Sequence, residues 1–336
     1  MGSCGGRVKR TRELVKEDVA KVLQMLEQVR ESDDKGRVIW RLGLVATWYF
    51  RQGYTLERRR AVLECYDEFQ AAFGERLRWR VVEGGRVHLV AGLQSRDLSS
   101  YLQAPDFAYP ESEKNWAILF HGGEQQEDAS DVHIYGLGSS RVECESFPEC
   151  LSYLTITVPL GFLTERPGAF PELVLRWSQR LQPFHGYGGI GIQIMHDDGL
   201  AGMHEKEVFA VAQRFPGLEV DYPMSHSLWT RQGIKGGNWL TVLSDHWVEK
   251  SGGVEKMRQA LGTELFRVDE YPGGAVILAG SIPEIGDRGG EVDVPNYRKL
   301  AHLLKPIRTT HHPGVHNTPG TFRWHEFEAW LARFDD

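Results

Sequence analysis

The 336-residue sequence lacks the features that would place it in a membrane or secreted class. No apolar run approaches the ~18 residues that a membrane helix requires. The first residues, MGSCGGRVKRTREL, have no apolar core of the kind found in signal peptides. The 4 cysteines are few for so long a chain, and they include no C-x-x-C pair. We therefore expect a cytoplasmic protein without a disulfide scaffold.

Signatures of nucleotide binding and nucleophilic catalysis are absent as well. GIKGGN is too short for a G-x-x-x-x-G-K-[ST] loop, and GLGSS does not supply the G-x-S-x-G of a serine hydrolase. The 39 Lys and Arg residues are outnumbered by 46 Asp and Glu residues, which gives a net charge of −7. This balance argues against a broad nucleic-acid-binding face and is compatible with a basic partner. We expect no cofactor.

The stretch GYGGIGIQIM, residues 186–195, contains the G-x-G-x-x-G pattern of dinucleotide-binding proteins. That pattern needs a strand before the glycines and a helix after them, because the helix N-terminus holds the pyrophosphate. Here the order is reversed. FPELVLRWSQRL has helical spacing upstream, and the isoleucines downstream alternate as in a strand. We interpret the glycines as a structural turn, a helix C-cap and a site of close backbone packing: Gly186, Gly188, Gly189 and Gly191.

Apolar periodicity elsewhere switches between helix and strand. Val38–Phe50 predicts a long strand, Thr55 caps the helix that follows, and LRWRVV predicts the next strand. The same order recurs over residues 153–195 and 238–280. NWAILF and DVHIYGL predict a hairpin, whereas MHEKEVFAVAQRF and RWHEFEAWLARF predict helices. We expect an α+β fold of mixed or antiparallel sheets, each covered by helices, with repeated strand–helix–strand units.

The same patterns divide the chain into three parts. An amphipathic stripe over residues 11–31 predicts an N-terminal helix within residues 1–35. A first α+β subdomain is expected over residues 36–145 and a second over residues 146–336. The boundary falls in a charged segment with Pro148 and little periodicity.

Histidines and carboxylates leave a metal-dependent hydrolase open as an alternative. HEKEV begins an H-E-x-x-H motif, but Val208 stands where the second histidine is required. HHPGVH contains Pro313 and Gly314, which exclude a helix, and DDG after a strand is typical of a turn. We therefore favour a solvated helix start, a surface loop and a turn over a metal site. The residues concerned are Asp197, Asp198, His204, His311, His312 and His316.

Acidic residues gather in three segments of the sequence. Taken singly, each segment is typical of a solvated loop. In a protein that covers a basic surface, the same residues would bind the partner. We expect the outer two segments to be exposed and to contact that partner through Glu124, Glu127, Asp128 and Asp131, and through Glu284, Asp287 and Glu291. Asp293 lies beside the last group, and the middle segment carries Glu143, Glu145 and Glu149.

Five phrases occur together in a recognisable order: GYGGIGI, HEKEVFAVAQRFPGLEVDYP, GIKGGNWLTVLSDHWVEKSGG, VILAGSIPEIGD and YRKLAHLLKPIR. In this combination the chain, from about Val38 to Arg308, resembles the TsiV-like family of type VI secretion immunity proteins. The resemblance implies a non-enzymatic cytoplasmic protein of bacteria that binds a toxin delivered by the type VI secretion system. It supplies no catalytic, cofactor or metal residues.

The resemblance also suggests how the toxin is blocked. Toxins of this class are often nucleases with a restriction-endonuclease-like fold, and a nuclease cleft carries Lys and Arg to hold phosphates. An acidic immunity protein would occlude that active site, without binding nucleic acid or membranes. Two other hypotheses remain, a metal-dependent hydrolase and a non-catalytic scaffold of a secretion-linked operon.

Overall fold

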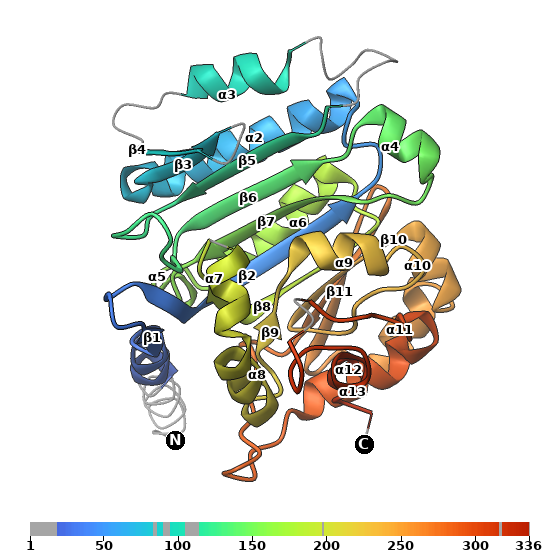
Figure 1. The fold of residues 1–336 in the computed structure, drawn as a ribbon. Coiled ribbons are helices and arrows are strands. Elements are labelled where there is room, and N and C mark those ends of the chain that lie inside the picture. The colour runs from blue at the N-terminus through green and yellow to red at the C-terminus, as the bar shows by residue number, and fades with distance from the viewer. Residues whose placement is uncertain are drawn as a thin grey trace, which may run out of the picture.

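One sheet organises the fold of the computed structural model, which describes residues 19–82, 86–89, 95–104, 114–196, 198–315 and 318–335 (Figure 1). The described strands follow the order β11-β12-β10-β8-β2-β7-β6-β5-β3-β4, with β1 added to β2 and β9 added to β8. Their bounds are β1 Arg30–Ser32, β2 Val38–Phe50, β3 Trp79–Val82, β4 Arg86–Leu89, β5 Trp116–His121, β6 His133–Gly138, β7 Ser152–Val158, β8 His185–Ile194, β9 Glu219–Val220, β10 Leu240–Ser244, β11 Phe266–Tyr271 and β12 Gly274–Ala279.

Strand pairing confirms the α+β class. Among the described strands, β8 and β9 run parallel and the other neighbours run antiparallel. These strands form a single sheet where we expected several. Strand β2, from the first expected subdomain, lies between β7 and β8 of the second. The division of the chain into two subdomains at residues 145/146 and the repeated strand–helix–strand units stay predictions.

The helices connect these strands along the chain. Thr55 caps α2 as expected, since its side chain accepts a hydrogen bond from the Arg58 amide. The helical bounds are α2 Leu56–Phe73, α3 Ser95–Leu102, α4 Arg141–Ser146, α5 Phe162–Glu165, α6 Ala169–Leu181, α7 Asp198–Met203, α8 Glu205–Arg214, α9 Pro223–Trp229, α10 Asp245–Lys250, α11 Val254–Leu261, α12 Pro295–Leu304 and α13 His325–Leu331, with short 3₁₀ turns η1 Gly74–Arg76 and η3 Lys305–Ile307.

The expected N-terminal helix ends earlier than its apolar stripe suggested. Its described part covers residues 19–27, and residues 1–18 lie outside the described residues. The chain then turns into β1, which pairs with β2 through Arg30 and Arg41, so the end of the 11–31 stripe is strand. None of the helices in the described part of the chain is long and apolar enough to cross a membrane.

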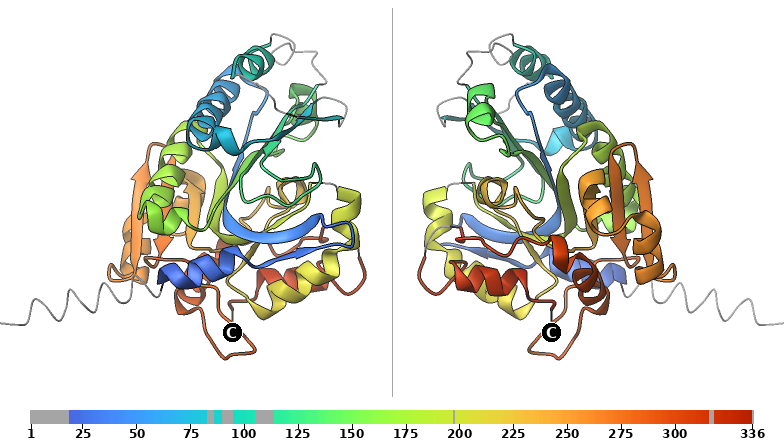
Figure 2. Two further views of the ribbon diagram at one scale, coloured as in Figure 1. Left: turned by 90° about the vertical axis from the view of Figure 1, so that its left-hand side faces the viewer. Right: turned by 90° about the vertical axis from the view of Figure 1, so that its right-hand side faces the viewer.

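The two faces of the central strands differ in character. Side chains alternate along β2, so Trp48 points to the face covered by α2 and α6 (Figure 2). There the Trp48 and Trp177 rings lie 5.2 Å apart, and the Trp48 indole donates to Ser178. The opposite face of β2 carries Thr47 and Tyr49, and α4, α7, α8 and α9 lie on that side (Figures 1 and 2). One face is therefore an aromatic core, and the other presents polar groups that need partners.

Our interpretation of the glycine stretch as a turn is wrong. Gly186, Gly188, Gly189 and Gly191 lie within β8, between β2 and β10. The reversal after α6 is made upstream by Gln182, whose φ of 44° is left-handed. The close backbone packing is nevertheless real. A Cβ at Gly186 would lie 2.5 Å from the Thr47 carbonyl oxygen, so β8 has room only for a hydrogen atom there.

This close approach predicts that adding a methyl group at Gly186 destabilises the fold more than adding one at Gly188. The Gly186→Ala substitution should lower the free energy of unfolding by about 1–3 kcal/mol, because the backbone at Thr47 cannot move without disturbing β2. Gly188→Ala is the matched control on the same strand face, since its nearest contact would be 3.2 Å. Urea unfolding of both variants measures the difference. Equal stability of the two variants would contradict the packing argument.

Candidate functional site

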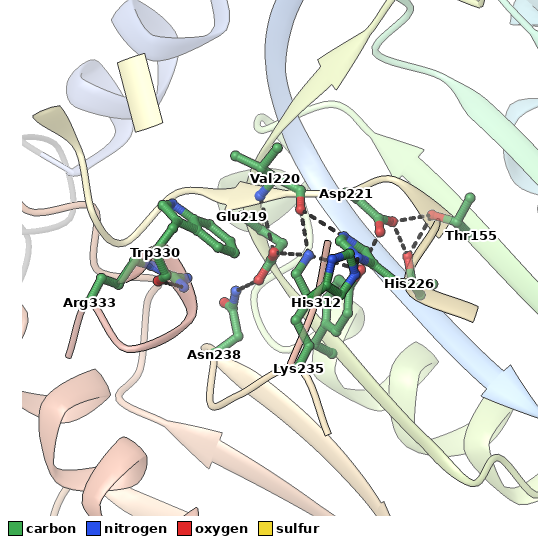
Figure 3. Close-up of polar contacts among 12 residues, drawn as sticks. Thr155, Glu219, Val220, Asp221, His226, Lys235, Asn238, His312, Trp330 and Arg333 are labelled. Atoms are coloured by element: carbon green, nitrogen blue, oxygen red, sulfur yellow. Dashed lines mark hydrogen bonds and ion pairs between the residues drawn. The ribbon is translucent and has the colours of Figure 1, made fainter. Parts of the chain in front are cut away.

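Charged side chains are enclosed where β9 and the chain leading to β10 cover the polar face of the sheet (Figure 3). Lys235 and Glu219 are each 3% exposed, and they form an ion pair. Lys235 also donates to the Val220 carbonyl, while the Asn238 amide donates to Glu219 over 2.6 Å. Burial lowers the pKa of Lys235, and Glu219 and Asp221 oppose that shift. The amine is therefore held by acceptors of its own chain.

Asp221 connects this ion pair to the hydroxyl groups of the central strands. Its carboxylate accepts hydrogen bonds from Thr47, from Tyr187 and, over 3.2 Å, from Thr155. Burial raises the pKa of Asp221, whereas Lys235 and the hydroxyl donors lower it. The residues come from β2, β7, β8 and the segment after β9. One carboxylate therefore joins three neighbouring strands to the segment that crosses them.

The C-terminal region closes the network from the other side. His312 is fully buried, and its Nε2 lies 3.1 Å from Nδ1 of His226. Burial lowers the pKa of His312 to about 3, so the imidazole is neutral at pH 7. The Lys235 amine lies 5.3 Å from the Trp330 ring, and the Arg333 guanidinium stacks 3.6 Å from the same ring. These contacts dock α13 onto the network, in agreement with the apolar stripe of that helix.

A second polar cluster lies at the far ends of β5, β6 and β8. The His196 ring lies 4.2 Å from that of His121 and 4.6 Å from that of His133. Both ring nitrogens of His133 are buried without a hydrogen-bond partner among the described residues. Burial lowers the pKa of His121 to about 4 and that of His133 to about 3. The three imidazoles are thus packed as neutral rings.

The residues of the metal hypothesis are scattered. Asp197 and His316 lie outside the described residues, and Asp198 begins α7. His204 precedes α8, and His311 lies 3.2 Å from Glu328 on the surface. His312 is buried rather than on the surface loop that we expected, because it packs against His226 and Phe327. Within the described ranges, no group of three or more His, Cys, Asp or Glu residues is arranged to hold a metal ion.

Two members of the first acidic segment are not exposed, contrary to our expectation. Asp128 is 2% exposed, and it accepts hydrogen bonds from the Val38 and Gln125 amides. Asp131 accepts from Arg76 over 2.9 and 3.0 Å and lies 3.4 Å from an Arg41 nitrogen. Both carboxylates are thus bonded to distant parts of their own chain. Glu124 is exposed and Glu127 is half-buried.

The second acidic segment is also partly occupied by contacts within the fold. Glu284 accepts from the backbone and side-chain amides of Asn296, which stabilises the start of α12. Asp287 pairs with Arg214 at 3.1 Å. Glu291 is exposed, as we expected. Of the seven carboxylates assigned to partner binding, Asp128, Asp131, Glu284 and Asp287 therefore stabilise the protein itself.

The middle acidic segment contains a disulfide that the sequence analysis did not predict. Cys144 and Cys150 are bonded, although we expected no disulfide scaffold. Ser140 caps α4 through the Glu143 amide, and the turn after the helix brings the two Cα atoms to 5.5 Å. That separation is normal for a disulfide. The bond closes a loop whose residues 145–149 are all exposed.

The fold and its interior define an α+β protein with an open antiparallel sheet, whose enclosed charges are bonded to one another. The chain belongs to the TsiV family, type VI immunity for VRR-NUC, whose model matches residues 61–334. The family resemblance of the five phrases is thereby confirmed.

One solved structure shares the fold along nearly the whole chain. The Pseudomonas aeruginosa T6SS protein PA0821 superposes with a TM-score of 0.79 at 24% identity, over 94% of this chain and 90% of that chain. No curated protein matches the sequence.

Because the Lys235–Glu219 pair is enclosed, removing one partner should lower the free energy of unfolding strongly. Lys235→Met should destabilise the fold by about 3–5 kcal/mol, because it leaves Glu219 enclosed without its cation. The double variant Glu219→Gln/Lys235→Met should lose less than the sum of the single variants. Glu255→Gln, which breaks an exposed pair with Arg258, should cost at most about 1 kcal/mol. Additive losses in a denaturation double-mutant cycle would show that the two groups are not coupled.

The histidine cluster predicts acid sensitivity. The pKa of His133 is lower in the fold than its ordinary value of 6.5, so between these values the unfolded chain takes up a proton that the folded protein does not. The contribution of His133 to the free energy of unfolding is therefore full above pH 6.5 and is lost as the pH falls below it. His133→Leu should reduce this loss by up to about 1.4 kcal/mol per pH unit between pH 6 and pH 4. His325→Leu, at a side chain that is 96% exposed, should leave the pH profile unchanged. Chemical unfolding across this range tests both expectations, and identical profiles for the two variants would refute the first.

Proposed function

We propose that this protein binds the VRR-NUC nuclease domain of a cognate type VI effector and blocks it by occluding its active site. The observation that carries the proposal is the family match over residues 61–334, since the family is described as immunity against VRR-NUC. The net charge of −7 supports it, because a nuclease cleft must be basic to hold phosphates. The protein would act in the cytoplasm, where the nucleic acid to be protected lies, although disulfides such as Cys144–Cys150 are rare in that compartment.

The protein performs no bond chemistry in this proposal. Lys235, Glu219 and Asp221 resemble a catalytic group by residue type, but each already has partners within the fold. Lys235 pairs with Glu219 and donates to the Val220 carbonyl, whereas Asp221 accepts from hydroxyl groups of the sheet. We assign them to holding the fold together. Inhibition then comes from steric exclusion of nucleic acid from the cleft of the effector.

The decisive experiment mixes purified protein with the purified nuclease domain of the effector. We expect a stoichiometric complex, loss of DNA cleavage in proportion to the protein added, and survival of cells that express both proteins. A scaffold would bind without protecting cells. A hydrolase would remove the toxicity by turnover, at a ratio far below one to one. Either result would reject occlusion.

The three carboxylates of the outer acidic segments that form no ion pair or cap within the described part of the fold, Glu124, Glu127 and Glu291, should set the rate of association. Glu124→Lys/Glu127→Lys and, separately, Glu291→Lys should slow association several-fold at low salt, because complementary charge steers encounter. The difference should vanish at about 1 M salt, where screening is nearly complete. Glu264→Lys is the control at another exposed carboxylate. Stopped-flow mixing measures the rates. If no variant differs from wild type at low salt, these loops do not steer the effector.

A further inference from the structure

Both faces of β5 and β6 carry apolar side chains, and the described residues cover one face more completely than the other. Ile118, Phe120 and Ile134 are at most 2% exposed on the face that packs toward α2. On the other face, Leu119 and Leu137 remain half-exposed. Tyr135 lies between them in the strand register, also half-exposed, with its ring edge-on to Tyr153. A sheet that shows apolar side chains to solvent on one face is suited to a partner.

The network described above explains why this apolar face stays open. Helix α9 lies against β7 on the same side of the sheet and is held there by its contacts with the buried network. In Figure 1, none of the described helices on this side of the sheet lies over the middle of β5 and β6. The uncovered area is thus bounded on one side by α9.

The disulfide-closed loop borders the same face. Residues 144–150 lie in the connection between β6 and β7, and α4 and α9 project from the same side of the sheet (Figure 2). Phe147, at the centre of the loop, is 58% exposed. Glu149 accepts a hydrogen bond from Gln232, three residues after α9 ends. An aromatic side chain on a loop that is already cross-linked loses little conformational freedom when it binds.

The charge of this border indicates the chemistry of the partner. Residues 141–150 contain Arg141 and three glutamates, which gives one positive and three negative charges, a net of −2. Arg141 pairs with Glu145, so the surplus negative charge lies with Glu143 and Glu149. Apolar side chains with an acidic border complement a basic surface that contains an apolar recess. A phosphate-binding nuclease cleft has the required positive charge.

We propose that the open face of β5 and β6, bordered by the Phe147 loop, is the surface that receives the nuclease domain of the effector. Phe147 inserts into the cleft, Leu119, Tyr135 and Leu137 pack against its rim, and the glutamates of the loop pair with its Lys and Arg residues. The Cys144–Cys150 bond holds the loop ready for binding. This inference rests on the proposed function and adds the location of the contact.

The test measures the affinity of the full-length protein for the nuclease domain of the effector. Phe147→Ala should weaken binding by at least about tenfold, as expected for a central aromatic anchor. Val292→Ala is the matched control, because Val292 is also 58% exposed but lies in the loop before α12. Both variants should unfold at the wild-type temperature, since both side chains are exposed. Tight binding by Phe147→Ala would overturn the proposal.

Two further measurements do not depend on that single substitution. Cys144→Ser/Cys150→Ser should bind several-fold more weakly, because the loop must then be ordered on binding. Amide hydrogen exchange should slow in residues 117–119, 135–137 and 145–149 when the complex forms. Protection confined to other segments would overturn the proposal even if affinity fell. If wild-type protein binds no effector, the proposed function fails and this inference with it. Binding by wild type with unchanged variants defeats the inference alone.

Discussion

The enclosed amine of Lys235 is the constraint on which the rest of this fold depends. An ammonium group that is withdrawn from water destabilises a protein unless carboxylates and carbonyls surround it. Glu219, the Val220 carbonyl and Asp221 provide that environment, and they lie on a segment that crosses the polar face of the sheet. Helix α13 and His312 close the same space. Segments around β8, β9 and α13 therefore meet at one charge.

The buried network covers the polar face of the sheet over β8, β2 and β7, and leaves the same face over β5 and β6 for the proposed contact with the partner. Over β8, β2 and β7, hydroxyl groups bond to Asp221 and the face is covered by the protein itself. Over β5 and β6 the same face carries the buried His121 and His133 at one end, and Leu119, Tyr135 and Leu137 beyond them, which none of the described helices covers. Because the sheet is continuous through β2, the covered region supports the open one. As the proposed binding face, the open region would be held in place by the sheet before the partner arrives, which would reduce the entropic cost of association.

Local sequence patterns predicted secondary structure well. They predicted contacts between residues far apart in the sequence poorly. The alternation of Val38–Phe50 and the cap at Thr55 are fixed by neighbouring residues, and both were predicted. The glycines of β8 have no side chains to reveal their alternation, so a strand interior resembled a turn. Asp128 and Asp131 resembled solvated residues because their partners, Val38 and Arg76, lie 90 and 55 positions away. The buried network was missed for the same reason, since its members are ordinary surface residue types when taken singly.

In the proposed complex, charge would guide the encounter and apolar surface would form the close contacts, a distinction that the net charge alone does not reveal. Several carboxylates of this acidic chain are bonded to its own arginines and amides, so they cannot also form close pairs with a partner. Their field still contributes to steering before contact, because charges within about a Debye length act on an approaching partner. Close contact needs desolvated groups that the fold has left unused. In the described residues those groups are apolar and aromatic, so the selectivity of this protein for one nuclease over another should reside in the shape of the open face more than in its charge.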